Sequence, residues 1–315
     1  MKVGVFAVLL ADRLLEEALD FVKEVGCEAV ELGTGGYSGK AHCDPERLLK
    51  DAGALKEFRQ AVEGRGLEIS ALSCHGNPLH PDKDIARAHD EDFRDTVRLA
   101  AELGVETVVT FSGCPGDSEG SKRPNWVTCP WPPDFLKTLE WQWNERVGPY
   151  WKEAASFAEE HGVKVAIEPH PGFVVYNTDS FQRLREEVSG ENVGVNFDPS
   201  HLFWQQADPL ACVRELKDAI FHVHAKDTWV DVQNTRRNGM LDAKKYSDVV
   251  HRSWTFRTVG YGHGQEFWRA LASELRLAGY DWVISIEHED PLMGANEGLE
   301  KAVRFLKDAV IGEAW

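Results

Sequence analysis

The sequence lacks the features that would place it in a membrane, in the secretory pathway or on nucleic acid. It has no run of about 18 apolar residues, the length that a membrane-spanning helix needs. Its opening, MKVGVFAVLLADRLLEE, shows no signal-peptide cleavage pattern before the charges begin. Lys and Arg number 35 against 52 Asp and Glu, so the formal net charge is −17. Such a field repels phosphate groups. We therefore expect a cytoplasmic protein with no nucleic-acid or membrane partner.

Two motifs are also missing. There is no C-x-x-C pair, and in a long chain without an export signal the scattered cysteines are expected to be reduced and in several cases buried. None of the six is assigned a catalytic role. No G-x-G-x-x-G opens a helix after the first strand, where GTGG at 33–36 is only a partial match. A doubly wound open sheet is therefore disfavoured.

One pattern recurs along the 315 residues: an amphipathic helix, a glycine, then a short run rich in β-branched residues. It is seen in LDFVKEVGCEAVEL, VRLAAELGVETVVTF, SFAEEHGVKVAIEP and ASELRLAGYDWVISIE. The glycine fits a left-handed helix C-cap, and the apolar run fits a fully buried strand. The predicted strands are Val3–Leu9, Ala29–Leu32, Glu68–Ser73, Thr107–Phe111, Lys164–Ile167, Val193–Phe197, Ile220–His224 and Trp282–Glu287. The predicted helices are Leu14–Val25, Ala54–Glu63, Ala86–Leu103, Val147–Glu160, Phe181–Val188, Pro209–Ala219, Glu266–Ala278 and Leu299–Ala309.

The alternation of strand and helix predicts the fold class. Eight such units without a linker rich in Pro, Gly or Ser indicate an α/β protein, a single (β/α)8 TIM barrel in which residues 1–315 form one domain. The connections after strands four and seven, 112–146 and 225–264, are too long for turns and are expected to be lids or binding loops on the C-terminal face. The first holds Trp126, Trp131, Trp141 and Trp143, which either cover the mouth of the barrel or pack on neighbouring helices.

Metal-competent side chains follow strands five to eight. They are Glu168, Asp198, His224 and Glu287. The carboxyl ends of barrel strands share one mouth, and three carboxylates with one imidazole suit a divalent cation, Mn²⁺ first, with Co²⁺, Mg²⁺ or Zn²⁺ as options. Taken alone, Asp198 would be interpreted as the N-cap of the next helix, but capping does not account for the whole set. We assign His222 to the core, bonded to the backbone, and Glu289 and Asp290 to the surface.

These residues lie in segments that resemble a known superfamily. AIEPH, NFDPSHLFW, HVHAKD and SIEHED, in this order and at these strand ends, are similar to the xylose isomerase-like TIM barrels. That group includes sugar isomerases and epimerases, inosose dehydratase and apurinic endonucleases. LSCHGNPLHP at 72–81 and RTVGYGHGQEFW at 257–268 resemble it as well, so the likeness covers nearly the whole chain. The resemblance implies that Glu168, Asp198, His224 and Glu287 ligate one metal ion and that Glu168 and Glu287 are the catalytic acid/base pair. It implies that His75, His201, Lys226 and Arg257 bind substrate.

The endonuclease branch of this superfamily is disfavoured. It needs an additional histidine after strand four and an Asp-x-His after strand seven. Here strand four ends in Phe111-Ser112-Gly113, and no such triplet occurs in 225–264. The net charge of −17 also argues against a DNA substrate.

The expected function is that of a divalent-metal-dependent sugar isomerase or epimerase. It would abstract a proton next to a carbonyl and pass through an enediolate intermediate. Loss of a leaving group from that intermediate would make the protein a lyase on an oxo-sugar, similar to inosose dehydratase or to the large subunit of C-glycoside deglycosidases. A non-enzymatic sugar-binding barrel is a remoter alternative. The expected partners are a small carbohydrate substrate and further copies of the chain, with a small partner subunit if the protein is deglycosidase-like.

Overall fold

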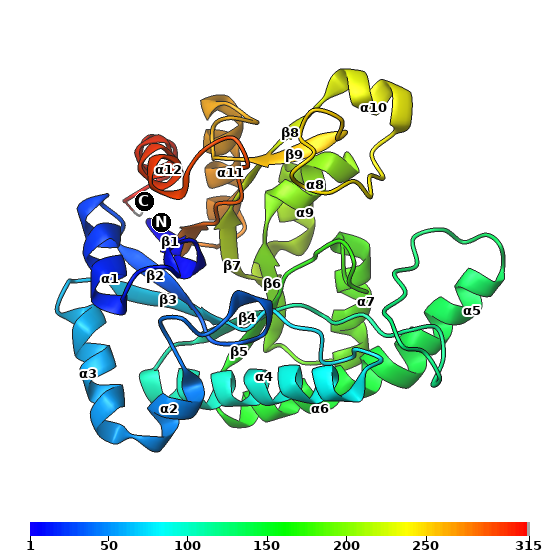
Figure 1. The fold of residues 1–315 in the computed structure, drawn as a ribbon, viewed down its shortest axis with the longest axis horizontal. Helices are drawn as coiled ribbons and strands as arrows, with labels where there is room; N and C mark the ends of the chain where they lie inside the picture. Colours follow the sequence, from blue (N-terminus) through cyan, green and yellow to red (C-terminus); the bar gives the residue numbers. More distant parts are fainter. Residues whose placement is uncertain (314–315) are drawn as a thin grey trace. The chain divides into compact units, whose positions relative to one another are not determined.

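The computed structural model describes residues 1–313, and its eight parallel strands close into a barrel with helices between them (Figure 1). The order around the barrel is β1-β10-β7-β6-β5-β4-β3-β2. The barrel strands are β1 (Lys2–Phe6), β2 (Ala29–Gly33), β3 (Glu68–Ser73), β4 (Thr107–Thr110), β5 (Lys164–Ile167), β6 (Val193–Phe197), β7 (Ile220–Ala225) and β10 (Val283–Ile286). The predicted (β/α)8 fold is confirmed.

The helices follow the strands around the barrel. They are α1 (Leu15–Glu24), α2 (Pro45–Lys50), α3 (Ala52–Glu63), α4 (Lys83–Leu103), α5 (Asp134–Trp141), α6 (Gly148–Glu160), α7 (Thr178–Val188), α8 (Pro199–Gln205), α9 (Pro209–Leu216), α10 (Val232–Asn238), α11 (Gln265–Leu277) and α12 (Ala295–Ala309). Short 3-10 turns occur at Ala7–Leu10, Gly36–Ser38 and Lys217–Ala219, and a π-helical turn at Gln142–Val147. The first of these turns replaces the end of the predicted strand Val3–Leu9.

The glycine in the recurring pattern has the predicted conformation. Gly104 ends α4 in the left-handed region with φ +72°, and its N–H bonds to the last carbonyls of the helix. The equivalent glycines, Gly26, Gly162 and Gly279, also have positive φ. Because a side chain would strain this conformation, glycine fixes where each helix ends and the next strand begins.

The chain divides into two compact units. The first unit comprises residues 1–31, 61–70 and 197 onward. Parallel pairing joins β2 to β1, β1 to β10 and β10 to β7. The register sets Phe6 opposite Glu31 and Ser285 opposite His224. Helix α12, red in Figure 1, packs on α11 and on β1 and β10.

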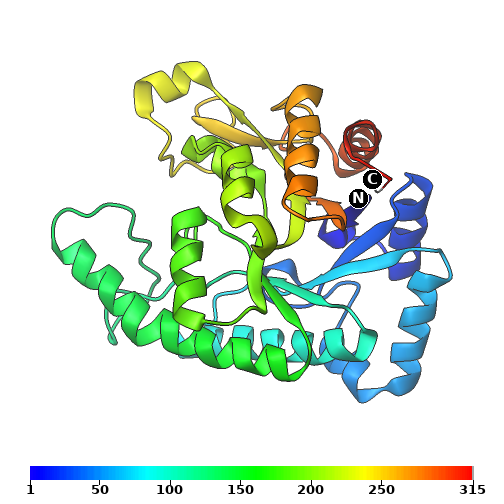
Figure 2. The ribbon, with the colours of Figure 1, turned by 180° about the vertical axis from the view of Figure 1, so that it is seen from behind.

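The second unit comprises residues 32–60 and 71–196. Its strands β3, β4, β5 and β6 run parallel, with Ile167 opposite Val195. Helices α4 and α6 lie side by side in both ribbon views (Figures 1 and 2). In α4, Phe93, Val97 and Ala100 are buried, and their spacing of four and three residues places them on one face.

The long connection after β7 contains secondary structure of its own. Strands β8 (Asp227–Val230) and β9 (Trp254–Arg257) form an antiparallel pair in which Asp227 faces Arg257, and α10 lies between them in the chain. The indole of Trp254 stacks on Trp204 of α8 at 4.8 Å between ring centroids. In residues 1–313, no helix combines the length and the apolar composition that a bilayer crossing requires.

Candidate metal centre

Asp198 has two roles in the structure, one for each carboxylate oxygen. It is the N-cap of α8, where Oδ1 accepts a hydrogen bond of 2.8 Å from the backbone N–H of Ser200. Oδ2 lies 3.2 Å from Nε2 of His201 and 3.2 Å from Nζ of Lys226. The helix cap therefore holds Asp198 in place while its second oxygen takes part in a cluster of charged and imidazole groups.

His224 and Glu287 lie beside Asp198 in the first unit. Nδ1 of His224 is 3.1 Å from Oε2 of Glu287. Asp198, His224 and Glu287 each present one ligand atom, and these atoms lie within 4.8 Å of one another. Asp198 and His224 are buried, and the Glu287 side chain is 14 % exposed. Two carboxylates and one imidazole nitrogen at this spacing fit a divalent cation of the Mn²⁺ or Zn²⁺ type.

The ammonium of Lys226 lies against the same carboxylates. Nζ is 2.7 Å from Oε2 of Glu287 and 3.2 Å from Oδ2 of Asp198. It also lies 3.2 Å from Oε2 of Glu289, whose side chain is 51 % exposed. The Lys226 side chain is only 1 % exposed and packs 4.8 Å from the ring centroid of Phe256. A buried ammonium at this point balances part of the acidic charge and is a candidate proton donor.

Glu168 is held rigidly in the second unit at the end of β5. Its backbone N–H donates to the carbonyl of Thr110 on β4. Oε2 accepts from Nδ2 of Asn196 at 2.8 Å and lies 3.0 Å from Nε2 of His75. Nδ1 of His75 is 2.9 Å from Oγ of Ser38. An ionised carboxylate can only accept, so His75 carries its proton on Nε2 and the hydroxyl of Ser38 donates to Nδ1. His75 therefore contacts Glu168, and its role in substrate binding stays a prediction.

Arg257, the last residue of β9, is partly exposed and pairs with Asp290, whose side chain is buried. Nε of Arg257 donates to Oδ2 of Asp290 at 3.0 Å, and the backbone N–H of Thr258 donates to the same oxygen at 2.8 Å. Burial would raise the pKa of Asp290, but backbone hydrogen bonds from Thr258 and Leu292 and the charge of Arg257 lower it. The assignment of Asp290 to the surface is therefore wrong. Substrate binding by Arg257 and by His201 stays a prediction.

Glu31 of β2 is a buried carboxylate that the sequence analysis did not single out. Its two oxygens lie 2.9 and 3.0 Å from Nε2 of His224, and Oε2 accepts from Oγ of Ser285 at 2.6 Å. His222, predicted to be a core histidine bonded to the backbone, is fully buried, and its Nε2 lies 3.4 Å from Oγ of Ser70 and 3.8 Å from Oε2 of Glu31; the backbone bond stays a prediction. Burial would raise the pKa of Glu31, but His224, His222 and the hydrogen bond from Ser285 outweigh it and lower the pKa to about 2. The available signal was an acidic residue inside the apolar strand AVELG.

Asp227 anchors the segment that follows β9. Its buried Oδ2 accepts from the backbone N–H groups of Gly260, Gly262 and His263 at 3.0, 3.0 and 2.8 Å. Oδ1 lies 2.8 Å from Nδ1 of His263. At Gly262 a Cβ atom would lie 2.4 Å from the carbonyl oxygen of Thr228, so glycine is required for this close approach. The glycines of VGYGHGQ thus allow the chain to wrap around one carboxylate.

The tryptophan-rich segment after β4 is ordered within the second unit. Trp143 is buried, with the guanidinium of Arg183 4.4 Å from its ring centroid. Gln142 ties the segment together by donating from Nε2 to the carbonyls of Gly116 and Asn125. Trp131 is 73 % exposed. Trp143 therefore packs on α7, as one of the two expectations has it, and a role for the segment as a lid stays a prediction.

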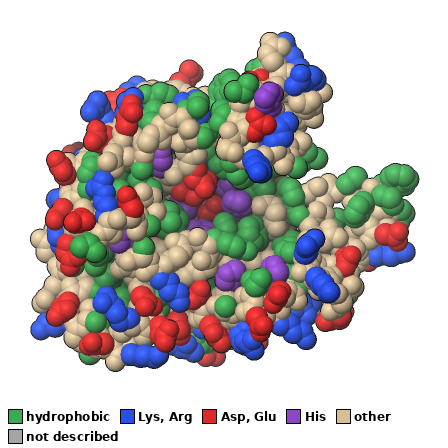
Figure 3. All heavy atoms as spheres, viewed as in Figure 1, with side chains coloured by type: hydrophobic (Ala, Val, Ile, Leu, Met, Phe, Trp, Pro, Cys, Tyr) green, Lys and Arg blue, Asp and Glu red, His purple; other side chains and the backbone are tan. Residues whose placement is uncertain are grey.

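Acidic and histidine side chains are grouped near the centre of the face shown in Figure 3, apart from the mixed charges of the outer surface.

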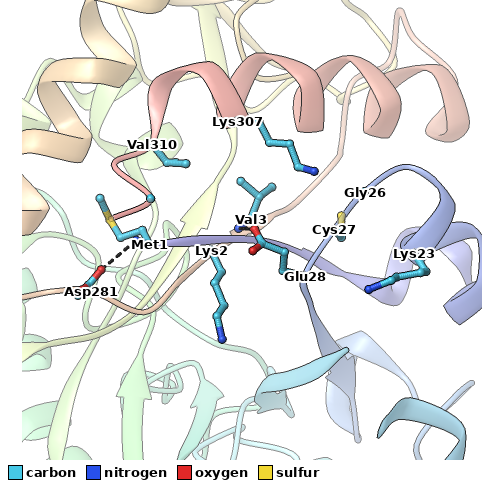
Figure 4. Close-up of a pocket in the computed structure, with 11 residues that line it drawn as sticks. Met1, Lys2, Val3, Lys23, Gly26, Cys27, Glu28, Asp281, Lys307 and Val310 are labelled. Atoms are coloured by element: carbon cyan, nitrogen blue, oxygen red, sulfur yellow. Dashed lines mark hydrogen bonds and ion pairs between the residues drawn. The ribbon is translucent and has the colours of Figure 1, made fainter. Parts of the chain in front are cut away.

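A separate cavity of about 720 Å³ in the first unit lies at the amino ends of β1 and β10 (Figure 4). Lys2, Lys23 and Lys307 line it, but their side chains point in different directions. Barrel enzymes place their chemistry at the carboxyl ends of the strands. We therefore assign the candidate site to the strand ends and not to this cavity.

Comparisons with known proteins agree with this architecture. A family model described as xylose isomerase-like TIM barrel matches residues 19–309. The uncharacterized protein YfiH of Bacillus subtilis (strain 168) is 37 % identical over 98 % of this chain and 99 % of its own length. The rhizopine catabolism protein MocC of Rhizobium meliloti is 30 % identical over 89 % of this chain and 76 % of its own. An inosose dehydratase of Lacticaseibacillus casei is 26 % identical over 88 % of this chain and 83 % of its own.

Solved structures share the fold at lower identity. The IolI protein, solved with a bound zinc atom, superposes on this chain with a TM-score of 0.67 at 20 % identity. The match covers 98 % of this chain and 98 % of IolI. The 3-keto-D-glucoside 4-epimerase YcjR from E. coli gives a TM-score of 0.59 at 17 % identity and covers 98 % of this chain and 99 % of its own. The dehydratase and the epimerase among these proteins are enzymes. The chain belongs to the xylose isomerase-like TIM barrel family.

Proposed function

We propose that this protein is a divalent-metal-dependent lyase that removes water from a polyhydroxylated carbonyl compound of the inosose type. The observation that carries the proposal is the convergence of Asp198, His224 and Glu287, with the buried ammonium of Lys226 2.7 Å from Glu287. This group combines cation ligands, a carboxylate base and a proton donor at the carboxyl ends of three barrel strands.

We propose Glu168 as the fourth ligand and Mn²⁺ as the ion, with Co²⁺, Mg²⁺ or Zn²⁺ as alternatives. Support comes from the pairing of β5 with β6, which brings Glu168 into hydrogen-bond contact with Asn196, two residues before Asp198 in the chain. The IolI protein, which shares this fold, was solved with a bound zinc atom, and this supports a divalent ion here. A divalent ion at these ligands would polarise the substrate carbonyl and acidify the neighbouring C–H.

Side chains of this protein would carry out the proton transfers of the reaction. A carboxylate, Glu168 or Glu287, accepts the proton from the carbon next to the carbonyl. The electron pair of that C–H bond forms a C=C bond as the hydroxyl on the next carbon leaves. Lys226 donates a proton to the departing oxygen, so the products are water and an unsaturated carbonyl compound.

Dehydration is preferred over isomerisation for two reasons. Inosose dehydratases match 88 % of this chain at 26 % identity, whereas the epimerase YcjR is 17 % identical. Lys226 also supplies the acid that a departing hydroxyl needs. Isomerisation or epimerisation remains the second candidate, because Glu168 and Glu287 are two carboxylates that could remove and return one proton.

A product analysis in heavy water tests the proposal. Chelator-treated protein is reloaded with Mn²⁺ and incubated with a panel of inososes and ketoses, and NMR follows both the loss of water and the deuterium content of each carbon. We expect an unsaturated ketone from an inosose and no turnover before metal is restored.

The outcomes separate the candidates. Deuterium at one carbon of an isomeric or epimeric product, without loss of water, would replace the lyase by the isomerase or epimerase. If protein with bound metal neither exchanges a proton nor changes any compound of the panel, both reactions are contradicted.

A further inference from the structure

A second carboxylate, Glu31, contacts Nε2 of His224, the ring nitrogen that does not face Glu287. Glu31 and His224 are fully buried, and so is Ser285, which donates to Glu31 at 2.6 Å. An ionised carboxylate is costly to bury unless its oxygens are bonded. Here three contacts of 2.6 to 3.0 Å reach its two oxygens. The hydrogen bonds therefore stabilise the buried charge of Glu31. That charge acts on the imidazole of His224.

The two nitrogens of His224 have different neighbours. Nε2 lies 2.9 and 3.0 Å from the oxygens of Glu31, and Nδ1 lies 3.1 Å from Oε2 of Glu287. Because the Glu31 carboxylate only accepts, Nε2 must carry a hydrogen, which leaves Nδ1 as the nitrogen whose lone pair can bind a cation. Phe6 packs on the ring with 5.7 Å between centroids and 25° between planes, and so restricts its tilt.

We propose that Glu31 is a positioning residue: with Ser285, it fixes the tautomer and the orientation of His224 so that Nδ1 faces the metal. This inference rests on the metal centre of the proposed function. Ligating histidines usually donate their second N–H to a carboxylate, and loss of that partner weakens metal binding. The competing explanation is a second metal site, because Glu31, His222 and His224 also present ligand atoms within 4.8 Å of one another. The two explanations predict different stoichiometries.

The test uses Mn²⁺ alone as the probe, so no substrate is needed. The parent protein is compared with Glu31→Gln, which keeps the shape of the side chain and removes its charge, and with Ser285→Ala. Glu28→Gln is the matched control, because Glu28 immediately precedes the same strand and its carboxylate accepts a hydrogen bond of 3.3 Å from the backbone N–H of Val3, away from His224. Three properties are measured for each protein: the affinity and stoichiometry of Mn²⁺ binding, the absorption spectrum of the Co²⁺-loaded protein, and the melting temperature.

We expect one ion per chain in every protein, and an affinity lowered by about 10- to 100-fold in Glu31→Gln, the range found when the partner of a ligating histidine is lost. The Co²⁺ spectrum should shift, since the ligand geometry changes, whereas Glu28→Gln should match the parent. Ser285→Ala should weaken binding in the same direction by a smaller factor, and it supplies the result if Glu31→Gln fails to fold.

Two results would overturn the inference while leaving the proposed function intact. One is a folded Glu31→Gln, or in its place Ser285→Ala, with the affinity and spectrum of the parent. The other is a parent that binds two ions and loses one in Glu31→Gln, which would make Glu31 a ligand. A parent that binds no Mn²⁺ would contradict the metal centre itself, and with it both proposals.

Discussion

Replacing Lys226 by methionine should lower the free energy of unfolding of the metal-free protein. The same change should raise the affinity of the protein for a divalent metal ion. The side chain is 1 % exposed, and its ammonium lies 2.7 and 3.2 Å from carboxylate oxygens of Glu287 and Asp198. Removing one partner of a buried ion pair costs about 3–5 kcal/mol, because the opposite charge is left without compensation. The third contact, Glu289, is half exposed and can turn to water, so it adds little.

A divalent cation would balance the negative charge of the same carboxylates. The free energy of unfolding that Lys226→Met loses should therefore be largely recovered when metal binds. Recovery of about 3 kcal/mol corresponds to an affinity for Mn²⁺ that is tighter by roughly 100-fold, at 1.4 kcal/mol for each factor of ten. The free energy of unfolding, measured by urea titration, should therefore differ strongly between Lys226→Met and parent in chelator. The difference should be small in saturating Mn²⁺.

Lys244→Met is the matched control. Lys244 pairs with Asp242 at 2.9 Å, and its side chain is 37 % exposed. Asp242 is buried but keeps the backbone N–H groups of Lys244 and Ser253 as donors, so Lys244→Met should lose less stability than Lys226→Met. It should change neither the metal affinity nor the difference between the two conditions. The reasoning is refuted if Lys226→Met loses the same stability with and without Mn²⁺, or if it binds Mn²⁺ more weakly than the parent.

Four further outcomes are expected. Asp227→Ala should lower the free energy of unfolding by at least about 3 kcal/mol, since three backbone N–H groups lose their acceptor at about 1–3 kcal/mol each; a loss below about 1 kcal/mol by urea titration would contradict this. Glu168→Gln and Glu287→Gln should each reduce kcat by a factor of about 10² to 10⁴ in a folded protein, and near-parental rates in both would exclude them as bases. Trp143→Ala should cost about 3–5 kcal/mol because the ring is buried. The exposed Trp131 should be replaceable within about 0.5 kcal/mol, so a fall in its kcat/KM alone would indicate substrate contact.

Local patterns were sufficient to predict the barrel. The strands Glu68–Ser73, Lys164–Ile167 and Val193–Phe197 have the predicted bounds, because a glycine or a polar turn precedes each and the run itself is apolar. The antiparallel pairing of β8 with β9 was not predicted. Its partners lie far apart in the chain, as Asp227 and Arg257 do, and nothing local specifies that register.

The candidate site was predictable where a polar side chain follows a strand. Asp198, His224 and Glu287 were found in this way, and the structure brings their ligand atoms together. Glu31 was missed because it lies inside a strand, where only tertiary contacts with His224 and Ser285 give it a role. Side-chain partners of this kind are set by register and packing, which a single sequence does not reveal.

The metal centre at the strand ends is the central claim, and Mn²⁺ binding to chelator-treated protein tests it most directly. Asp198→Ala is compared with Asp208→Ala, because both aspartates precede a proline and cap a helix, α8 and α9, while only Asp198 also contacts Lys226. Loss of the cap should cost each variant about 1 kcal/mol of stability, and Asp198→Ala loses its buried ion pair with Lys226 in addition. The account predicts one ion per chain in the parent and in Asp208→Ala, and greatly weakened binding in Asp198→Ala. A parent that rebinds no Mn²⁺, or an Asp198→Ala variant that binds it as tightly as the parent, would contradict the account.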